Sequence, residues 1–254
     1  MSKYTAIGAG PSADLITVRG LRALKAADMI LYDRLADAEL LDECRAKKIF
    51  VGKQPYACTV RQAEINRLIG EHLAKGRSVA RLKGGDSVIF SRVMEEIATA
   101  RECGAEIEII PGVTAASAAA AKVELALTDR EYASGVVYIT GHQKGGMPEY
   151  DWKAIAANNF TVVVYMGAKY IGHIVESLME GGMDKDMPVL AATDIGHDSE
   201  SYRLFKAGDI TGSAINPAGS ATVFIIGNVL KNLNTETGLE TESVIPGLTR
   251  DLTR

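Results

Sequence analysis

The sequence predicts an α/β protein with two α/β domains, and three observations carry this prediction. In the first half, short apolar runs alternate with segments of helical periodicity, which requires crossover helices between mostly parallel strands. Most of these runs end in a turn that contains glycine or proline. After Leu127-Thr128-Asp129-Arg130 the pattern changes to a strand-rich second half. We therefore expect mostly parallel or mixed sheets, with ligands bound beyond the carboxyl ends of the strands.

The first half is predicted to form five strands separated by helices. The strands are expected at Tyr4–Ile7, Met29–Tyr32, Lys48–Val51, Ser78–Leu82 and Glu106–Ile110. Helices are expected at 17–27, at 91–103, and from a capping box of Thr59 and Gln62 through Leu73. An alanine-rich helix is expected at 114–127.

The second half is predicted to contain five further strands and one long helix. The strands are expected at Gly135–Thr140, Phe160–Tyr165, Pro188–Ala192, Tyr202–Lys206 and Ala221–Ile226. Tyr170–Met179 has the apolar spacing of a helix. The predicted domains are 1–115 and 116–231, followed by a flexible polar tail at 232–254, with a crevice between the two domains.

Composition narrows the class of protein. The 254 residues are 47% hydrophobic and 24% charged with a net charge of −4, which argues against duplex nucleic acid as a partner. The three cysteines and four histidines show no metal-ligand spacing, so no metal is expected. The N-terminus has no signal-peptide pattern and no run reaches the ~20 apolar residues of a membrane span, so we expect a cytoplasmic protein.

One motif admits two interpretations. Gly8-Ala9-Gly10-Pro11-Ser12-Ala13 follows a strand and matches the dinucleotide-binding fingerprint, with Asp33 about 20 residues further on. This pattern favours an NAD-dependent oxidoreductase. Pro11, however, removes one backbone N–H that a phosphate cradle could use. A tight turn without ligand explains the same residues.

Eight short segments stand in a fixed order between Tyr4 and Leu230. They are Ala6-Ile7-Gly8-Ala9-Gly10-Pro11, Tyr32-Asp33-Arg34-Leu35, Val51-Gly52-Lys53, 81–90, 110–115, Leu127-Thr128, Thr140-Gly141-His142 and Tyr165-Met166-Gly167. Together they resemble the uroporphyrinogen-III C-methyltransferases of the tetrapyrrole/precorrin methyltransferase family. The resemblance implies the tetrapyrrole methylase fold, a homodimer, and an active site in the crevice between the domains. It also implies that S-adenosyl-L-methionine methylates uroporphyrinogen III at C2 and C7, giving precorrin-2 and S-adenosyl-L-homocysteine for siroheme or cobalamin biosynthesis.

The resemblance also assigns roles to residues. It implies cofactor contacts at Pro11, Gly84, Gly85, Asp86, Ile89, Thr114, Ala115, Met166, Gly196 and Thr222. It implies that Asp33 accepts a proton and that Lys53 donates one. By their chemistry, Asp33 can instead orient pyrrole N–H groups or be a surface turn residue, and Lys53 can bind a substrate carboxylate.

A substrate with eight carboxylates calls for cations near these loops. Arg34, Arg81, Arg130 and His142 are the candidates, because arginine pairs with carboxylates in a bidentate way. The chain departs from the family pattern at Ser87–Met94 and at Asp129, on the side expected to face the substrate. Methylation of another precorrin and a tetrapyrrole-binding protein without activity therefore stay open beside the main hypothesis.

Overall fold

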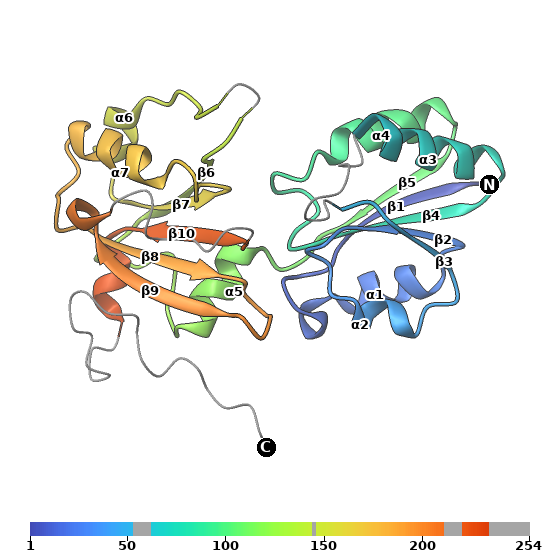
Figure 1. The fold of residues 1–254 in the computed structure, drawn as a ribbon, viewed down its shortest axis with the longest axis horizontal. Helices are drawn as coiled ribbons and strands as arrows, with labels where there is room; N and C mark the ends of the chain where they lie inside the picture. The colour runs from blue at the N-terminus through green and yellow to red at the C-terminus, as the bar shows by residue number, and fades with distance from the viewer. Residues whose placement is uncertain (53–61, 144–145, 211–219, 234–254) are drawn as a thin grey trace, which may run out of the picture. The chain divides into compact units, whose positions relative to one another are not determined.

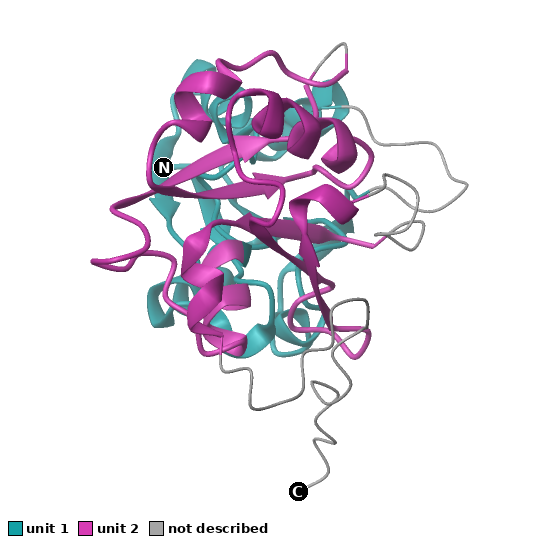
Figure 2. Cartoon of the chain, turned by 90° about the vertical axis from the view of Figure 1, so that its left-hand side faces the viewer, with its two compact units in different colours: residues 1–115 teal, residues 116–254 magenta. Residues whose placement is uncertain are grey.

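The computed structural model describes residues 1–52, 62–143, 146–210 and 220–233. The chain divides into two compact units, Met1–Ala115 and Ala116–Arg254, which Figure 2 shows in different colours. Each unit has its own five-stranded sheet. Lys53 and Thr59 lie outside the described residues, and so does the predicted tail 232–254 apart from its first two residues.

The sheet of the first unit is entirely parallel. Its strands are β1 (Lys3–Gly8), β2 (Met29–Tyr32), β3 (Lys47–Phe50), β4 (Ser78–Lys83) and β5 (Glu106–Ile110). They lie in the order β3-β2-β4-β1-β5, and every neighbouring pair runs parallel. All five carboxyl ends therefore lie along one edge of the sheet, which is where the glycine-containing loops begin.

Helices cover both faces of this sheet. Helices α1 (Val18–Lys25) and α2 (Glu39–Asp42) lie on one face, and α3 (Gln62–Ala74) and α4 (Val93–Glu102) lie on the other (Figure 1). The strands alternate between two cores: Tyr4 and Val79 belong to the core under α3 and α4, whereas Ile7 and Ala80 belong to the core that Leu24 of α1 shares. The four-residue α2 was not predicted, because so short a segment shows no periodicity.

The sheet of the second unit is mixed. Its strands are β6 (Gly135–Thr140), β7 (Phe160–Tyr165), β8 (Pro188–Thr193), β9 (Ser201–Lys206) and β10 (Thr222–Ile226). They lie in the order β6-β7-β10-β8-β9; β6 and β7 are parallel, and the other neighbours are antiparallel. The fold class is therefore α/β with one parallel and one mixed sheet, as predicted.

Helix α7 (Ile171–Glu180) supplies much of the second core. Its apolar face packs with Val164 of β7 and Phe224 of β10, both fully buried. Helix α6 (Trp152–Ala156) was not predicted. The alanine-rich α5 (Ala115–Lys122) is shorter than the predicted helix 114–127, because Glu124 adopts a left-handed conformation with φ of 55° that ends it.

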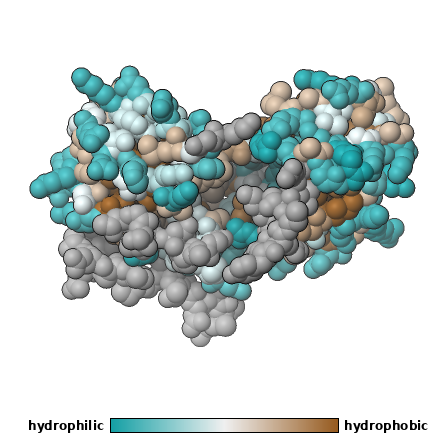
Figure 3. Space-filling view, turned by 45° about the horizontal axis from the view of Figure 1, so that its top comes forward, coloured by the Kyte–Doolittle hydropathy of each residue, from teal (hydrophilic) through white to brown (hydrophobic). Residues whose placement is uncertain are grey.

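Short 3-10 helices complete the described elements, at Ala13–Leu15, Ala207–Asp209 and Asn228–Asn232. On the face shown in Figure 3, hydrophilic and apolar side chains are interspersed over both units. Exposed apolar side chains in the first unit include Val88, Phe90 and Met94, which come just before or at the start of α4.

No helix among the described residues is long and apolar enough to cross a membrane.

Candidate functional site

Three glycine-containing loops pack backbone against backbone at the carboxyl edge of the parallel sheet. The amide of Gly10 donates to the carbonyl of Gly85 at 3.1 Å, and the amide of Gly85 donates to the carbonyl of Gly10 at 2.9 Å. A Cβ at Gly8 would lie 2.5 Å from the amide nitrogen of Gly112, and a Cβ at Gly112 would lie 2.5 Å from the carbonyl oxygen of Gly85. Side chains at Gly8 or Gly112 would force the loops after β1, β4 and β5 apart.

The loop after β2 joins the same assembly. A Cβ at Gly84 would lie 2.4 Å from the Cβ of Leu35, so only glycine lets the β4 loop pass under Leu35. The amide of Leu35 donates to Oδ1 of Asp33 at 3.1 Å, which turns the chain sharply after β2. Asp33 is thereby placed beside the Gly84-Gly85-Asp86 segment.

Asp86 fixes the end of the glycine loop. Its Oδ1 accepts from the amide of Val88 at 3.1 Å and from the amide of Gly112 at 3.4 Å. Gly85 has φ of +69°, and a Cβ there would meet nothing nearer than the amide nitrogen of Ala115 at 3.8 Å. A Cβ on Gly85 would make only ordinary contacts with the loop after β5, and because glycine lacks this atom a ligand can approach the backbone closely there.

The hydrogen bonds of the first loop argue against the dinucleotide interpretation. The amides of Ala9 and Gly10 are already bonded to the β4 loop, and the amide of Ala13 donates to Asp37 at 3.2 Å. The loop leads into the 3-10 helix Ala13–Leu15, and α1 begins only at Val18, capped by Thr17. A phosphate cradle needs free amides at the start of a helix, and here those amides hold the turn.

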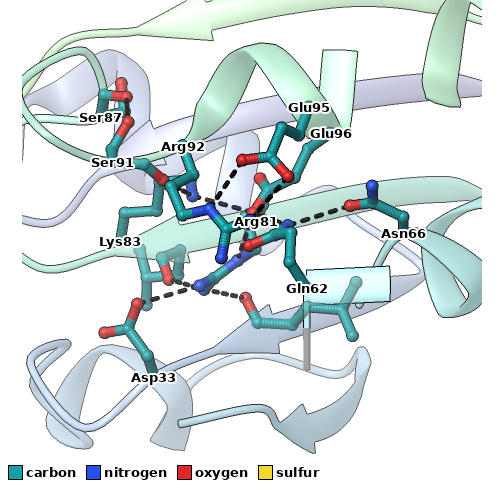
Figure 4. Close-up of polar contacts among 12 residues, drawn as sticks. Asp33, Gln62, Asn66, Arg81, Lys83, Ser87, Ser91, Arg92, Glu95 and Glu96 are labelled. Atoms are coloured by element: carbon teal, nitrogen blue, oxygen red, sulfur yellow. Dashed lines mark hydrogen bonds and ion pairs between the residues drawn. The ribbon is translucent and has the colours of Figure 1, made fainter. Parts of the chain in front are cut away.

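A cluster of charged side chains lies next to Asp33, as Figure 4 shows. Arg81, on β4, donates from Nη2 to Oδ2 of Asp33 at 3.0 Å, and its Nε lies 3.4 Å from Oε1 of Glu96. Lys83, two residues further along β4, donates to the same Glu96 oxygen at 2.9 Å and to the carbonyl of Ser91 at 2.7 Å. The side chains of Arg81 and Lys83 are 6% and 5% exposed and that of Glu96 is 0% exposed, so these charges are removed from water.

The cluster shifts the ionisation of its members. Burial lowers the pKa of Lys83, and the neighbouring positive charge of Arg81 lowers it further. Burial raises the pKa of Tyr4 far above its ordinary value, and so does the negative charge of Glu96, to which its hydroxyl donates at 2.6 Å. Within the described residues, no group of three or more His, Cys, Asp or Glu side chains could hold a metal ion.

The structure places the other proposed residues of the first unit as follows. Pro11 is buried next to Gly10, whereas Ile89, Thr114 and Ala115 are half-buried. Arg34 is exposed on the turn after β2. Lys53 lies outside the described residues. Arg81, which the sequence suggests as a substrate-binding residue, has its guanidinium buried against Asp33 and Glu96.

Three proposed cofactor contacts belong to the second unit and gather at one edge of its sheet. Met166 follows β7, is 51% exposed, and has φ of 53°, a strained conformation for methionine. Thr222 begins β10, next to β7, and its hydroxyl lies 3.0 Å from that of Thr193 at the end of β8. Gly196, with φ of +83°, donates its amide to Glu200 at 2.5 Å in the turn after β8.

The two remaining substrate-binding candidates are exposed on the second unit. Arg130 lies in the turn that the Asp129–Ala133 bridge closes. The ring of His142 stacks on Tyr170, with 6.1 Å between the ring centres and 7° between the planes. Both side chains therefore belong to a different unit from the Arg81–Glu96 cluster.

The sequence analysis missed Glu96, although a signal was present. Val93, Glu96, Ile97 and Ala100 form the buried face of α4 at helical spacing. A glutamate on such a face must meet a buried cation, and Arg81 and Lys83 alternate onto the same side of β4 as the apolar Val79.

Comparison with known proteins identifies the family of this chain. The family model described as Tetrapyrrole (Corrin/Porphyrin) Methylases matches residues 3–211. A siroheme synthase 2 of Cronobacter sakazakii is 39% identical over 88% of this chain and 49% of its own length. A siroheme synthase of Acinetobacter baylyi is 42% identical over 72% of this chain and 41% of its own length. The chain thus spans half or less of the length of these relatives.

Solved structures agree with the family match. The uroporphyrin-III C-methyl transferase of Thermus thermophilus complexed with S-adenyl homocysteine has a TM-score of 0.74 and 31% sequence identity. That comparison covers 90% of this chain and 93% of the other. The family model matches more than half of the chain, and the chain has two five-stranded sheets. This chain therefore belongs to the tetrapyrrole (corrin/porphyrin) methylases.

Proposed function

We propose that this chain is a uroporphyrinogen-III C-methyltransferase that uses S-adenosyl-L-methionine and forms precorrin-2. The observation that carries the proposal is the glycine-lined carboxyl edge of the parallel sheet, with Asp33 held beside it. The similarity to the Thermus enzyme, covering 93% of that chain, supports the same reaction. The siroheme synthases that the chain resembles point to the same substrate class.

The residues present fit the cofactor. Gly85 has no Cβ, so a ligand can approach its backbone more closely than at another residue, although its amide and carbonyl are already bonded to Gly10. Asp86 supplies a carboxylate beside it that can accept from an ammonium or hydroxyl group. We assign Pro11, Gly84, Ile89, Thr114 and Ala115 to the same ligand, and the cofactor contacts expected at Met166, Gly196 and Thr222 stay predictions.

The chemistry needs little from the protein beyond alignment and proton transfer. The cofactor supplies a methyl group on a positively charged sulfur, which leaves as a neutral thioether. The loops hold the reacting groups in line and exclude water. Each methylation exchanges one proton of the pyrrolic framework for the methyl group, and Asp33 takes that proton. Where Lys53 donates a proton during a tautomeric shift, the framework releases another to solvent, so that one proton is lost per methyl. Arg34, Arg130 and His142 meet the substrate's carboxylates.

The test is methyl transfer by the purified chain. Incubation with uroporphyrinogen III and cofactor labelled in the methyl group should give a product carrying two labelled methyls and an equivalent of S-adenosylhomocysteine per methyl, measured by mass spectrometry. Asp33→Asn should lower kcat by about 100-fold or more, because general-base catalysis contributes factors of about 100 to 10,000.

Asp42→Asn is the matched control, because Asp42 is an exposed carboxylate on α2 and should leave kcat unchanged. A product with a single methyl, or label appearing only with a later precorrin as acceptor, would move the assignment to another member of the family. Absence of label with every tetrapyrrole, combined with binding of S-adenosylhomocysteine, would favour a binding protein without activity.

Two further assignments stay open, one from the family resemblance and one from the sequence pattern. We propose that the chain acts as a homodimer, which light scattering of the purified protein would measure. We also propose that it works in the cytoplasm, which fractionation of the source cells would test.

A further inference from the structure

Both oxygens of the Asp33 carboxylate have fixed partners. Oδ1 accepts from the amide of Leu35 at 3.1 Å, and Oδ2 accepts from Nη2 of Arg81 at 3.0 Å. The side chain is still 25% exposed, so lone pairs remain open toward a ligand. The position of this carboxylate therefore depends on a local turn and on one buried guanidinium.

Arg81 reaches Asp33 along the neighbouring strand. Its Cα is paired with Leu31 of β2, two residues before Asp33. Its Nη1 donates to the carbonyl of Leu31 on β2 at 3.4 Å and to that of Leu82 on β4 at 2.6 Å. These contacts leave Nη2 directed at Asp33, as Figure 4 shows.

Glu96 holds Arg81 from the other side. Its carboxylate is fully buried and meets Nε of Arg81 at 3.4 Å and Nζ of Lys83 at 2.9 Å. The hydroxyl of Tyr4 and, at 3.3 Å, the amide nitrogen of Gln62 also donate to this carboxylate. The two Nη nitrogens of Arg81 are therefore held by hydrogen bonds, whereas Nε makes only an ion-pair contact with Glu96 and no hydrogen bond. A lysine has no planar fork with which to make these contacts.

We propose that Arg81 is a positioning residue that holds Asp33 in its reactive orientation and does not bind the substrate. This inference rests on the proposed function, in which Asp33 accepts a proton. Arg81 has 6% of its side chain exposed and every nitrogen next to a protein oxygen, so little of it is available to a substrate carboxylate. The exposed Arg34 and Arg130 are left to that task.

The experiment compares Arg81→Lys and Arg81→Met with the wild-type chain, each alone and combined with Asp33→Asn. Arg81→Met should lower kcat by about 100-fold, the scale of an ångström-sized misplacement of a catalytic group. Arg81→Lys should recover part of that loss, because a buried cation stays close to both carboxylates. Dissociation constants for S-adenosylhomocysteine and for uroporphyrin III, the oxidised form of the substrate, should change less than about twofold.

The double variant separates positioning from direct contact. If Arg81 acts through Asp33, adding Arg81→Met to Asp33→Asn should change the rate little further. Arg67→Met is the control, because this arginine of α3 pairs only with exposed Glu64 and Glu71 among the described residues and should leave kcat unchanged. Slow variants are followed by mass spectrometry over single turnovers.

Each outcome has one meaning. A loss of uroporphyrin III affinity of tenfold or more in both Arg81 variants would overturn the proposal and restore a substrate-binding role, as would rate losses that multiply in the double variant. If Arg81→Met does not fold, the affinity for uroporphyrin III and the rate of the double variant are measured with Arg81→Lys instead. An inactive wild-type chain would instead contradict the proposed function, whereas an active wild type with an active Arg81→Met variant would contradict only this inference.

Discussion

The two units bury different kinds of polar side chain. In the first, Arg81, Lys83, Glu96 and His72 are less than about a tenth exposed, together with two hydroxyl residues. In the second, the buried polar residues that the structure describes are Thr140, Thr161 and Thr193. The hydroxyl of Thr161 donates to the carbonyl of Leu127 at 2.7 Å, which satisfies it with a neutral partner.

The first unit therefore buries charged side chains beside its apolar cores, whereas the buried polar residues described in the second unit are neutral threonines. Burying charges is unfavourable unless each is paired, and replacing such groups by apolar ones is often neutral or stabilising. Packing alone therefore gives no reason for the cluster next to Asp33. The second unit reaches its core with α7 and the apolar strands, without a buried ion pair among the described residues. We infer that the cluster is retained for the position of Asp33.

The largest predicted effect is on stability when Glu96 is changed. Glu96→Gln leaves Arg81 and Lys83 buried without the carboxylate that both contact, and we expect the free energy of unfolding to fall by about 3–5 kcal/mol. Urea denaturation followed by far-UV circular dichroism measures this loss. The only tryptophan, Trp152, lies on α6, so its fluorescence reports on the second unit and should be affected less.

Glu95→Gln is the matched control on the same helix. Glu95 is exposed and pairs with Arg92 three residues before it, so its loss should be within about 1 kcal/mol. Equal losses for the two variants would show that burial of charge does not distinguish the first unit.

A smaller effect is predicted for two glycines of the first unit that share a backbone conformation. Gly85 and Gly104 have φ of +69° and +65°, and at neither would an added Cβ have another atom within 3.4 Å. Alanine at either should therefore lower stability by about 1 kcal/mol, the cost of a left-handed residue with a Cβ. Only Gly85→Ala should also weaken S-adenosylhomocysteine binding, by about tenfold, because the methyl group would stand where the ligand approaches.

Calorimetric titration of both variants measures the affinity. If Gly104→Ala weakened binding as much as Gly85→Ala, the effect would come from stability and not from the loop. If neither changed binding, Gly85 would have to be removed from the proposed cofactor contacts.

The fold was largely predictable because its strands carry a strong local signal. Met29–Tyr32, Glu106–Ile110 and Gly135–Thr140 were predicted to the residue, since each is a short run that contains isoleucine, leucine or valine and is followed by turn residues. Helix α5 was predicted too long, because alanine favours a helix and no nearby residue in the sequence indicates the left-handed conformation of Glu124. The short helices α2 and α6 depend on tertiary contacts, and the sequence shows no helical periodicity over so few residues.

In the sequence the candidate site is visible only where loops form it, and its cofactor contacts stay predictions. Gly84, Gly85 and Asp86 stood out because several glycine turns follow successive strands. The burial of Arg81 could not be predicted, because charged residues are usually exposed and its partner Glu96 is distant in the sequence. The dinucleotide fingerprint failed for the opposite reason: its spacing was right, but the amides of Ala9 and Gly10 are used by the β4 loop.

The smallest predicted effect concerns His72, another buried polar side chain of the first unit. Burial lowers its pKa, and so do the neighbouring positive charges, chiefly Arg77, whose Nη1 lies 3.1 Å from Nδ1. Below the ordinary value of about 6.5 the unfolded chain takes up a proton that the folded chain does not, so this group reduces stability as pH falls through that value and has no effect above it. His72→Gln should therefore shrink the difference in unfolding free energy between pH 7.5 and pH 5.5, measured by urea denaturation, whereas Arg67→Met on the same helix should leave it unchanged. An unaltered difference in His72→Gln would mean that His72 is not a source of acid sensitivity, and that the charged character of the first core is confined to the cluster next to Asp33.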